Sequence, residues 1–225
     1  PFCDVEAILL AAAILKDLGV LEKTVLEINS LGCPQTKVNY EKALSEYFTK
    51  FKSELSADSQ VRLEKNPLRI LDSKEPADID LLADAPKISD FFEPEAKLRF
   101  DEILNLLTKL GVKHRVNQRL VRGLDYYTST VFEFVMSHEG AQNTVLAGGR
   151  YDNLVEKMSG KKIPAIGFAA GVERLMLLAD LELKKARPIA VNYVSENEKT
   201  YAFEIVQKLR NSGFAAEFIF DGNFR

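Results

Sequence analysis

Apolar residues recur along the first half of the chain at helical spacing, with one short strand among them. The apolar stretch from Asp4 to Leu18 predicts a buried helix that Asp4 caps and Gly19 ends. The segment Thr24–Asn29 (TVLEIN) is rich in β-forming residues and predicts a strand. Beyond it, an apolar stripe at three- and four-residue steps comprises Tyr40, Leu44, Tyr47, Phe48 and Phe51. Residues 37–112 are therefore expected to be mostly helical, divided into short helices by Pro67, Pro76, Pro86 and Pro94.

From residue 120 onward the pattern changes to strands. Val131–Met136 (VFEFVM) and Thr144–Ala147 (TVLA) are separated by a loop short enough for antiparallel pairing. Ile163–Ala170 predicts a third strand. The helix expected next, Val172–Leu181, carries one apolar face made of Leu175, Leu178 and Leu181.

A different pattern follows Arg187-Pro188, which reads as a linker. It predicts the strand Ile189–Val194, the helix Glu198–Asn211 and the strand Ala215–Phe220, with Gly213 as the helix stop. The crossover through the helix makes these two strands parallel. We therefore predict an α/β (α+β) fold, in which an antiparallel sheet with helices is followed by the start of a parallel α/β domain.

The amino-acid composition and charge exclude several classes of protein. The 225 residues are 46% hydrophobic and 28% charged, as in ordinary globular proteins. The net charge of −3 excludes a basic-tail nucleic-acid binder but not a local basic face. Cys3 and Cys33 are too few for a disulfide framework or a four-cysteine zinc site, so a reducing, cytoplasmic location is expected. We see no signal peptide, and the apolar run Ala7–Leu15 is too short to span a membrane.

Three segments carry candidate chemistry, and the first is Leu120–Tyr127. The planar guanidinium of Arg122 suits a carboxylate or a phosphate. Tyr126 and Tyr127 stand at a strand entry, so we expect their side chains to point to opposite faces. The local alternative is a surface arginine beside two core tyrosines.

The second segment is Ala147–Asp152, where Gly148 and Gly149 stand at the expected strand end and Tyr151 follows. Paired glycines allow a positive φ and a close ligand approach, and the alternative is a plain tight turn. The third segment places Gly171 before a helix and Arg174 in its first turn. A bound phosphate would explain a cation there, whereas the alternative is an exposed arginine whose stem covers apolar surface.

Other candidate residues favour structural roles. His114 and His138 lie far apart without acidic or cysteine partners at ligand spacing, so neither metal binding nor general-base chemistry is predicted. Asp125 and Asp152 each follow a turn signal, which favours capping over a catalytic carboxylate pair.

Taken in order, LVRGLDYYTSTVFEF, AGGRYDNLVE and PAIGFAAGVERLMLL resemble the histidine-specific motifs and the third class II motif of histidyl-tRNA synthetases. The segments LEINSLG, NPLRILDSK and APKISDF resemble the bacterial-type insertion domain, and the closing β-α-β unit resembles the first half of the anticodon-binding domain. The resemblance implies four parts. These are 1–36, part of the catalytic core; 37–112, a helical insertion; 113–186, the core with the histidine motifs and motif 3; and 187–225, a partial anticodon-binding domain.

The resemblance also implies an activity and residue roles. Enzymes of this family join L-histidine and ATP to histidyl-adenylate and pass the histidyl group to tRNA(His). Arg122 would be the catalytic arginine at the α-phosphate. The histidine site would comprise Tyr126, Tyr127, Tyr151, Gly148 and Gly149, with the glycines as the pocket floor. Arg174 would lie over the adenine and near the phosphates of ATP, and Gly171 would let the nucleotide approach.

The family's motif 1, which builds the homodimer contact, and motif 2 would lie upstream of Pro1. We therefore expect a truncated core that is inactive by itself. Mg²⁺ is expected to accompany ATP, with no ligand identifiable here. A non-catalytic paralogue resembling the regulatory subunit of ATP phosphoribosyltransferase is the alternative, although that protein generally lacks the insertion and the intact arginine motif. A synthetase-like domain attached to a stress kinase is a third reading.

Overall fold

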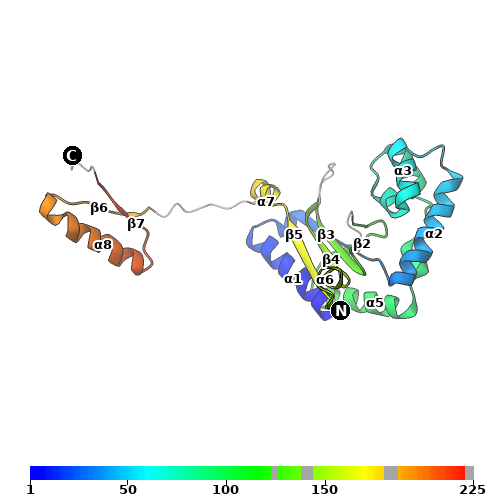
Figure 1. Cartoon of the computed structure of the whole chain (residues 1–225), viewed down its shortest axis with the longest axis horizontal. Coiled ribbons are helices and arrows are strands. Elements are labelled where there is room, and N and C mark those ends of the chain that lie inside the picture. The colour runs from blue at the N-terminus through cyan, green and yellow to red at the C-terminus, as the bar shows by residue number, and fades with distance from the viewer. Residues whose placement is uncertain (123–125, 138–143, 180–186, 221–225) are drawn as a thin grey trace. The chain divides into compact units, whose positions relative to one another are not determined.

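The computed structural model describes residues 1–122, 126–137, 144–179 and 187–220. The chain divides into two compact units, Pro1–Asp180 and Leu181–Arg225, which are described separately (Figure 1). The predicted combination of an antiparallel-dominated sheet, helices and a closing parallel unit is confirmed.

The first unit is built on a sheet with the strand order β2-β1-β3-β4-β5. Its strands are β1 (Thr24–Ser30), β2 (His114–Val116), β3 (Thr130–Met136), β4 (Thr144–Arg150) and β5 (Ile166–Ala170). All neighbours are antiparallel except β1 and β2, which run parallel. The strands predicted in β1 and β3 are confirmed, β5 begins three residues later than expected, and β2 was not predicted because three residues carry too little pattern.

Two long helices pack into one core with this sheet, α1 (Phe2–Asp17) and α5 (Pro94–Lys109), and they contact each other. Their buried residues join alternate residues of β1 and β3, and the consecutive Val145 and Leu146 of β4, in one core. Because α5 supplies Phe100, Ile103 and Leu107 to that core, the end of the predicted helical stretch packs with the sheet.

Asp4 does not cap α1, so this prediction is wrong. It lies inside the first turn, fully buried, with its carboxylate bound to the guanidinium of Arg150. A cap must stand just before the first turn, and here Pro1 holds that place. The predicted stop at Gly19 agrees with its φ of +68°, a conformation that favours glycine.

The helical stretch between β1 and α5 packs around a second core, which it shares with Leu31, Leu120, Tyr127 and Val131. It contains α2 (Pro34–Lys50), α3 (Ala57–Lys65), α4 (Pro76–Leu82) and the 3₁₀ turns η2 (Pro67–Asp72) and η3 (Ile88–Phe91). The predicted stripe on α2 is confirmed by the buried side chains of Tyr40, Leu44 and Phe48. Pro67, Pro76 and Pro94 each begin an element, because a proline at the first helical position loses no hydrogen bond there.

Two short helices flank β5 in the sequence, α6 (Leu154–Ser159) and α7 (Val172–Leu178). Leu175 and Leu178 pack against the sheet core, as the apolar face predicted, while Leu181 lies outside the described residues. A 3₁₀ turn, η1 (Leu21–Lys23), links α1 to β1.

The second unit pairs β6 (Ile189–Val191) in parallel with β7 (Ala216–Phe218). The turn η4 (Glu196–Glu198) and the helix α8 (Lys199–Asn211) cross between them and bury Ala202 and Val206 against Phe218. Both strands are shorter than predicted, but the predicted parallel crossover is confirmed. Among the described residues, no helix is long and apolar enough to cross a membrane.

Candidate active site

The candidate site lies on the face of the sheet opposite α1 and α5. Along β1 and β3 the side chains alternate, so Glu27 and Glu133 share the polar face and are direct cross-strand partners. A cavity of about 750 Å³ opens over them. Its walls come from β1, β3, β4, α7, the segment 117–122 and the helical stretch, and comprise Glu27, Leu71, Asp72, Ser73, Lys74, Ile79, Leu82, Asn117, Arg119, Leu120, Val121, Arg122, Glu133, Thr144 and Arg174.

Arg122 reaches into this cavity and is held by Glu133. Its Nη1 donates to Oε1 of Glu133, whose Oε2 accepts from Oγ1 of Thr144 at 2.7 Å. Within the described part of the chain, the buried Nε of Arg122 has no hydrogen-bond partner. Glu133 thus fixes the guanidinium from one side, and the guanidinium charge lies at the cavity wall, where it suits an anionic ligand.

Arg174 lies on the same cavity. It stands in the first turn of α7, and its Nη1 donates to the carbonyl oxygen of Thr144. Gly171 precedes the helix with an ordinary φ of −78°, and a Cβ there would meet only Cβ of Arg174, at 3.6 Å. The fold therefore does not require glycine at position 171, and the structure brings Arg122 and Arg174 together around Thr144.

Three tyrosines form a separate cluster beside Arg122. The rings of Tyr126 and Tyr127 lie 4.6 Å apart, and Tyr151 stands 5.8 and 6.5 Å from them. The guanidinium of Arg122 lies 5.9 Å from the centre of the Tyr127 ring and joins the cluster to the large cavity. Tyr126 and Tyr127 themselves line a smaller cavity of about 110 Å³.

The expectation that Tyr126 and Tyr127 point to opposite faces is wrong. Both precede β3, so the alternation of a strand does not apply to them, and their rings touch. Burial raises the pKa of the Tyr127 hydroxyl, and Tyr126 adds to that rise while Arg122 opposes it. Tyr127 therefore remains a neutral hydrogen-bonding group at physiological pH.

Gly148 and Gly149 do not end a strand, contrary to the prediction, but lie within β4, paired to both neighbouring strands. A Cβ on Gly148 would strike the carbonyl oxygen of Gly167 and come within 2.6 Å of Cβ of Phe168. A Cβ on Gly149 would come within 2.8 Å of the Tyr127 ring. Packing within the protein is thus sufficient reason for both glycines.

Sequence reasoning missed several residues of this site. Glu133 and Thr144 hold the two arginines, and the signal for Glu133 was a single charge inside the apolar strand VFEFVM. Gly167 was missed as well, although a Cβ there would meet the Tyr151 hydroxyl at 2.8 Å. A glycine inside a predicted strand is a signal for such a close approach.

The remaining candidate residues that lie in the described part of the chain have structural roles. Nδ1 of His114 lies 2.9 Å from the carbonyl oxygen of Val112. Asp152 accepts from the backbone N–H of Ala165 at 3.1 Å, as expected for a residue that caps a turn. Asp125 and His138 lie outside the described residues. No cluster of three His, Cys, Asp or Glu side chains suited to a metal occurs among the residues described.

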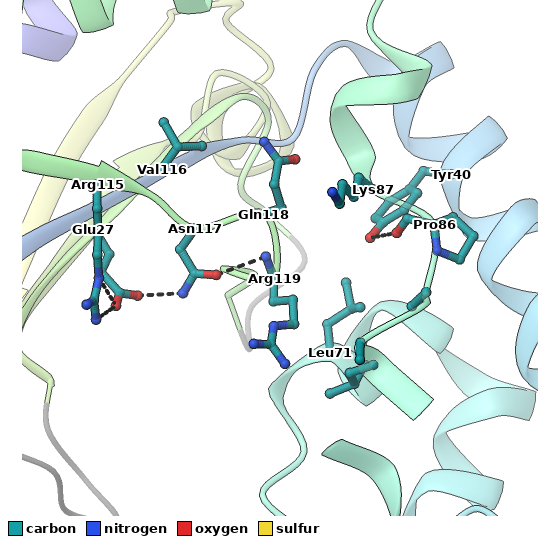
Figure 2. Close-up of a pocket in the computed structure, with 13 residues that line it drawn as sticks. Glu27, Tyr40, Leu71, Pro86, Lys87, Arg115, Val116, Asn117, Gln118 and Arg119 are labelled. Atoms are coloured by element: carbon teal, nitrogen blue, oxygen red, sulfur yellow. Dashed lines mark hydrogen bonds and ion pairs between the residues drawn. The ribbon is translucent and has the colours of Figure 1, made fainter. Parts of the chain in front are cut away.

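A second cavity, of about 500 Å³, adjoins the first and shares Glu27, Asn117 and Arg119 with it. Figure 2 shows a chain of polar contacts along its wall, from Arg115 through Glu27 to Asn117 and the backbone of Arg119. The segment carrying these residues leads directly to Arg122.

A family model described as histidyl-tRNA synthetase matches residues 3–175, which include both arginines, the tyrosine cluster and the glycines. The chain belongs to the histidyl-tRNA synthetase family. The histidine–tRNA ligase of Orientia tsutsugamushi strain Boryong is 51% identical over 94% of this chain and 52% of its own length. The chain thus spans about half the length of the curated relatives it matches.

Solved histidyl-tRNA synthetase structures share the fold. The crystal structure of the apo enzyme from Staphylococcus aureus has a TM-score of 0.72 and 30% identity, covering 100% of this chain and 56% of that one. A Bacillus halodurans structure, described as an ATP phosphoribosyltransferase regulatory subunit/histidyl-tRNA synthetase, has a TM-score of 0.56 and 20% identity over 97% of this chain and 60% of that one. At that identity the likeness concerns the fold alone.

Proposed function

We propose that this chain is part of a histidine–tRNA ligase, which activates L-histidine with ATP to histidyl-adenylate and transfers the histidyl group to tRNA(His). The observation that carries the proposal is the family match over residues 3–175, within which Arg122 and Arg174 share one cavity. We assign the activity to the full-length protein. The polypeptide 1–225 is expected to form no adenylate by itself.

Activation is an in-line attack on phosphorus. A carboxylate oxygen of histidine forms a bond to the α-phosphorus of ATP while the bond to pyrophosphate breaks. Negative charge builds on the α-phosphoryl oxygens, and the Arg122 guanidinium stabilises it more than it stabilises the ground state. Two contacts support this role: Glu133 fixes one side of the guanidinium at the cavity wall, and Thr144 in turn holds the Glu133 carboxylate.

The tyrosine cluster is our proposed histidine site. Tyr126, Tyr127 and Tyr151 offer aromatic walls and hydroxyl groups suited to an imidazole ring. Gly149 forms the floor beneath this cluster, since a Cβ there would strike the Tyr127 ring. Gly148 faces Phe132 and Phe168 in the core on the other side of the sheet, so its predicted place in the pocket floor is wrong. Arg174 would bind the adenine ring and the phosphates of ATP, with Gly171 allowing close approach.

Mg²⁺ would enter with the phosphates of ATP. The protein residues described do not form a site for it, because both oxygens of Glu133 already bind Arg122 and Thr144. We therefore assign Mg²⁺ no ligand in this chain. In the second step, a ribose hydroxyl of tRNA(His) attacks the adenylate carbonyl and AMP leaves. Homodimerisation and a cytoplasmic location complete the proposal.

The alternative is a non-catalytic paralogue that binds histidine, as the Bacillus halodurans description allows. The intact arrangement of Arg122 on Glu133 favours the ligase, because binding histidine as a signal needs no cation at an α-phosphate.

The deciding experiment is ATP–pyrophosphate exchange by the full-length gene product, with each of the other amino acids as a control. The proposal predicts exchange with histidine alone. Histidine binding without exchange would establish the paralogue instead. Rapid exchange by the purified 1–225 polypeptide would contradict the expectation that this part is inactive alone.

A further inference from the structure

Two carboxylates oppose each other on the polar face of the sheet. Glu27 on β1 and Glu133 on β3 are direct cross-strand partners and line the same cavity. Like charges in this position destabilise a sheet unless each has its own partner. Because Arg122 binds Glu133, the carboxylate of Glu27 needs hydrogen-bond donors from other residues.

Those donors come from the segment that follows β2. Nε and Nη2 of Arg115 both donate to Oε1 of Glu27, the first at 2.9 Å, and Nδ2 of Asn117 donates to Oε2 at 2.5 Å. The Glu27 side chain is only 10% exposed. Both of its oxygens are therefore occupied without Arg122 (Figure 2).

The same asparagine fixes the turn that leads to Arg122. Its backbone N–H donates to the carbonyl of Ile28 at 3.0 Å, and its Oδ1 accepts from the N–H of Arg119 at 3.0 Å. Its carbonyl accepts from the N–H of Leu120 at 2.9 Å. Asn117 therefore connects β1 to the end of β2, to the turn and to Leu120. Leu120 is buried and lies two residues before Arg122.

We propose that Asn117 and Arg115 are positioning residues for Arg122, acting through Glu27. Asn117 holds the turn in place, and both residues occupy the carboxylate that would otherwise compete with Glu133 for the guanidinium. This assignment rests on the proposed function, since it concerns how Arg122 is aimed at the α-phosphate. A displacement of about 1 Å in a group of this kind can cost as much as two orders of magnitude in rate.

The test uses the full-length enzyme and histidine-dependent pyrophosphate exchange. Asn117→Ala is expected to lower kcat about tenfold while the KM for histidine changes less than about twofold. Arg115→Ala breaks the network from an exposed side chain, so it should fold normally and lower kcat in the same direction. Asn39→Ala, an exposed asparagine on α2, is the matched control and should leave kcat unchanged.

A double-mutant cycle separates positioning from a general structural role. If Asn117 acts through Arg122, adding Asn117→Ala to Arg122→Ala should reduce kcat by less than about a further twofold. Equal losses in both backgrounds, or an Asn117→Ala and an Arg115→Ala enzyme with wild-type kcat, would overturn the assignment. A wild-type protein without any exchange would overturn the proposed function itself, which is a different outcome.

Discussion

The buried carboxylate of Asp4 on α1 accepts hydrogen bonds from two nitrogens of Arg150 at the end of β4, at 2.9 Å from Nε and 2.7 Å from Nη2. The third nitrogen of Arg150, Nη1, donates to Asp152 at 2.9 Å. The ion pair joins α1 to β4, the strand that carries Gly149. Arg150 itself directly precedes Tyr151 in the chain. The arginine of the AGGRYD segment therefore belongs to the scaffold that supports the candidate site.

Replacing Asp4 by alanine should destabilise the protein by about 3–5 kcal/mol, because it leaves the buried Arg150 guanidinium without its principal partner. Thermal or urea unfolding of the full-length protein measures this loss. Asp17→Ala, on the exposed end of α1, is the control and should change stability by less than about 0.5 kcal/mol. Equal stability of the Asp4→Ala and Asp17→Ala variants would contradict the structural role.

The same pair predicts a pH dependence. Burial alone would raise the pKa of Asp4, but hydrogen bonds to Arg150 and Thr130 and the charges of Arg150 and Arg99 outweigh it and hold that pKa below its ordinary value of about 4. A carboxyl whose pKa is lowered by folding contributes stability above its unfolded pKa and loses it as pH falls through the folded pKa. Acidification from pH 5 towards pH 2 should thus lower the Tm of the wild type more than that of Asp4→Ala. Parallel Tm curves would refute this linkage.

Arg122→Ala in the full-length enzyme should lower the rate of histidine activation by at least about 10²-fold, the scale expected when one transition-state charge contact is lost. Pyrophosphate exchange at saturating histidine and ATP measures the rate. Arg62→Ala on α3, a residue that lines neither of the two large cavities, should be neutral. Unchanged turnover in Arg122→Ala would remove its catalytic assignment.

Arg174→Ala and Gly171→Ala should both raise the KM for ATP, for different reasons. The first removes a cation from the cavity, and the second adds a methyl group where the nucleotide approaches. Because the added Cβ meets only Cβ of Arg174 at 3.6 Å, Gly171→Ala should leave the Tm unchanged. A normal ATP KM in either variant, measured by exchange kinetics, would refute that residue's placement at the nucleotide.

Tyr127→Phe should weaken histidine binding while leaving ATP use nearly unchanged, because it removes one hydroxyl from the cluster and keeps the ring that packs over Gly149. The KM for histidine in the exchange assay is the readout, and the Tm reports any loss of packing. A wild-type histidine KM would mean that the Tyr127 hydroxyl serves the protein core and not the substrate.

Local pattern was enough to predict many elements. The stripe of Tyr40, Leu44 and Phe48 gave α2, and the run VFEFVM gave β3, because periodicity depends only on neighbouring residues. The glycine pair shows where local reasoning fails. Gly148 and Gly149 carry a turn signal, yet pairing with β3 and β5 on both sides keeps them in a strand.

By itself, the sequence determined the fold class, the order of most elements and the three motif segments from which the family resemblance follows. Only the tertiary structure decided which side chains meet: Arg122 with Glu133, Glu27 with Asn117, and Asp4 with Arg150. These partners are 11, 90 and 146 residues apart in the chain. Hydrophobic periodicity depends on residues that are close in the sequence, so it can be read from the sequence alone. A buried charge needs a partner, and the packing of elements that are distant in the chain decides which residue that is.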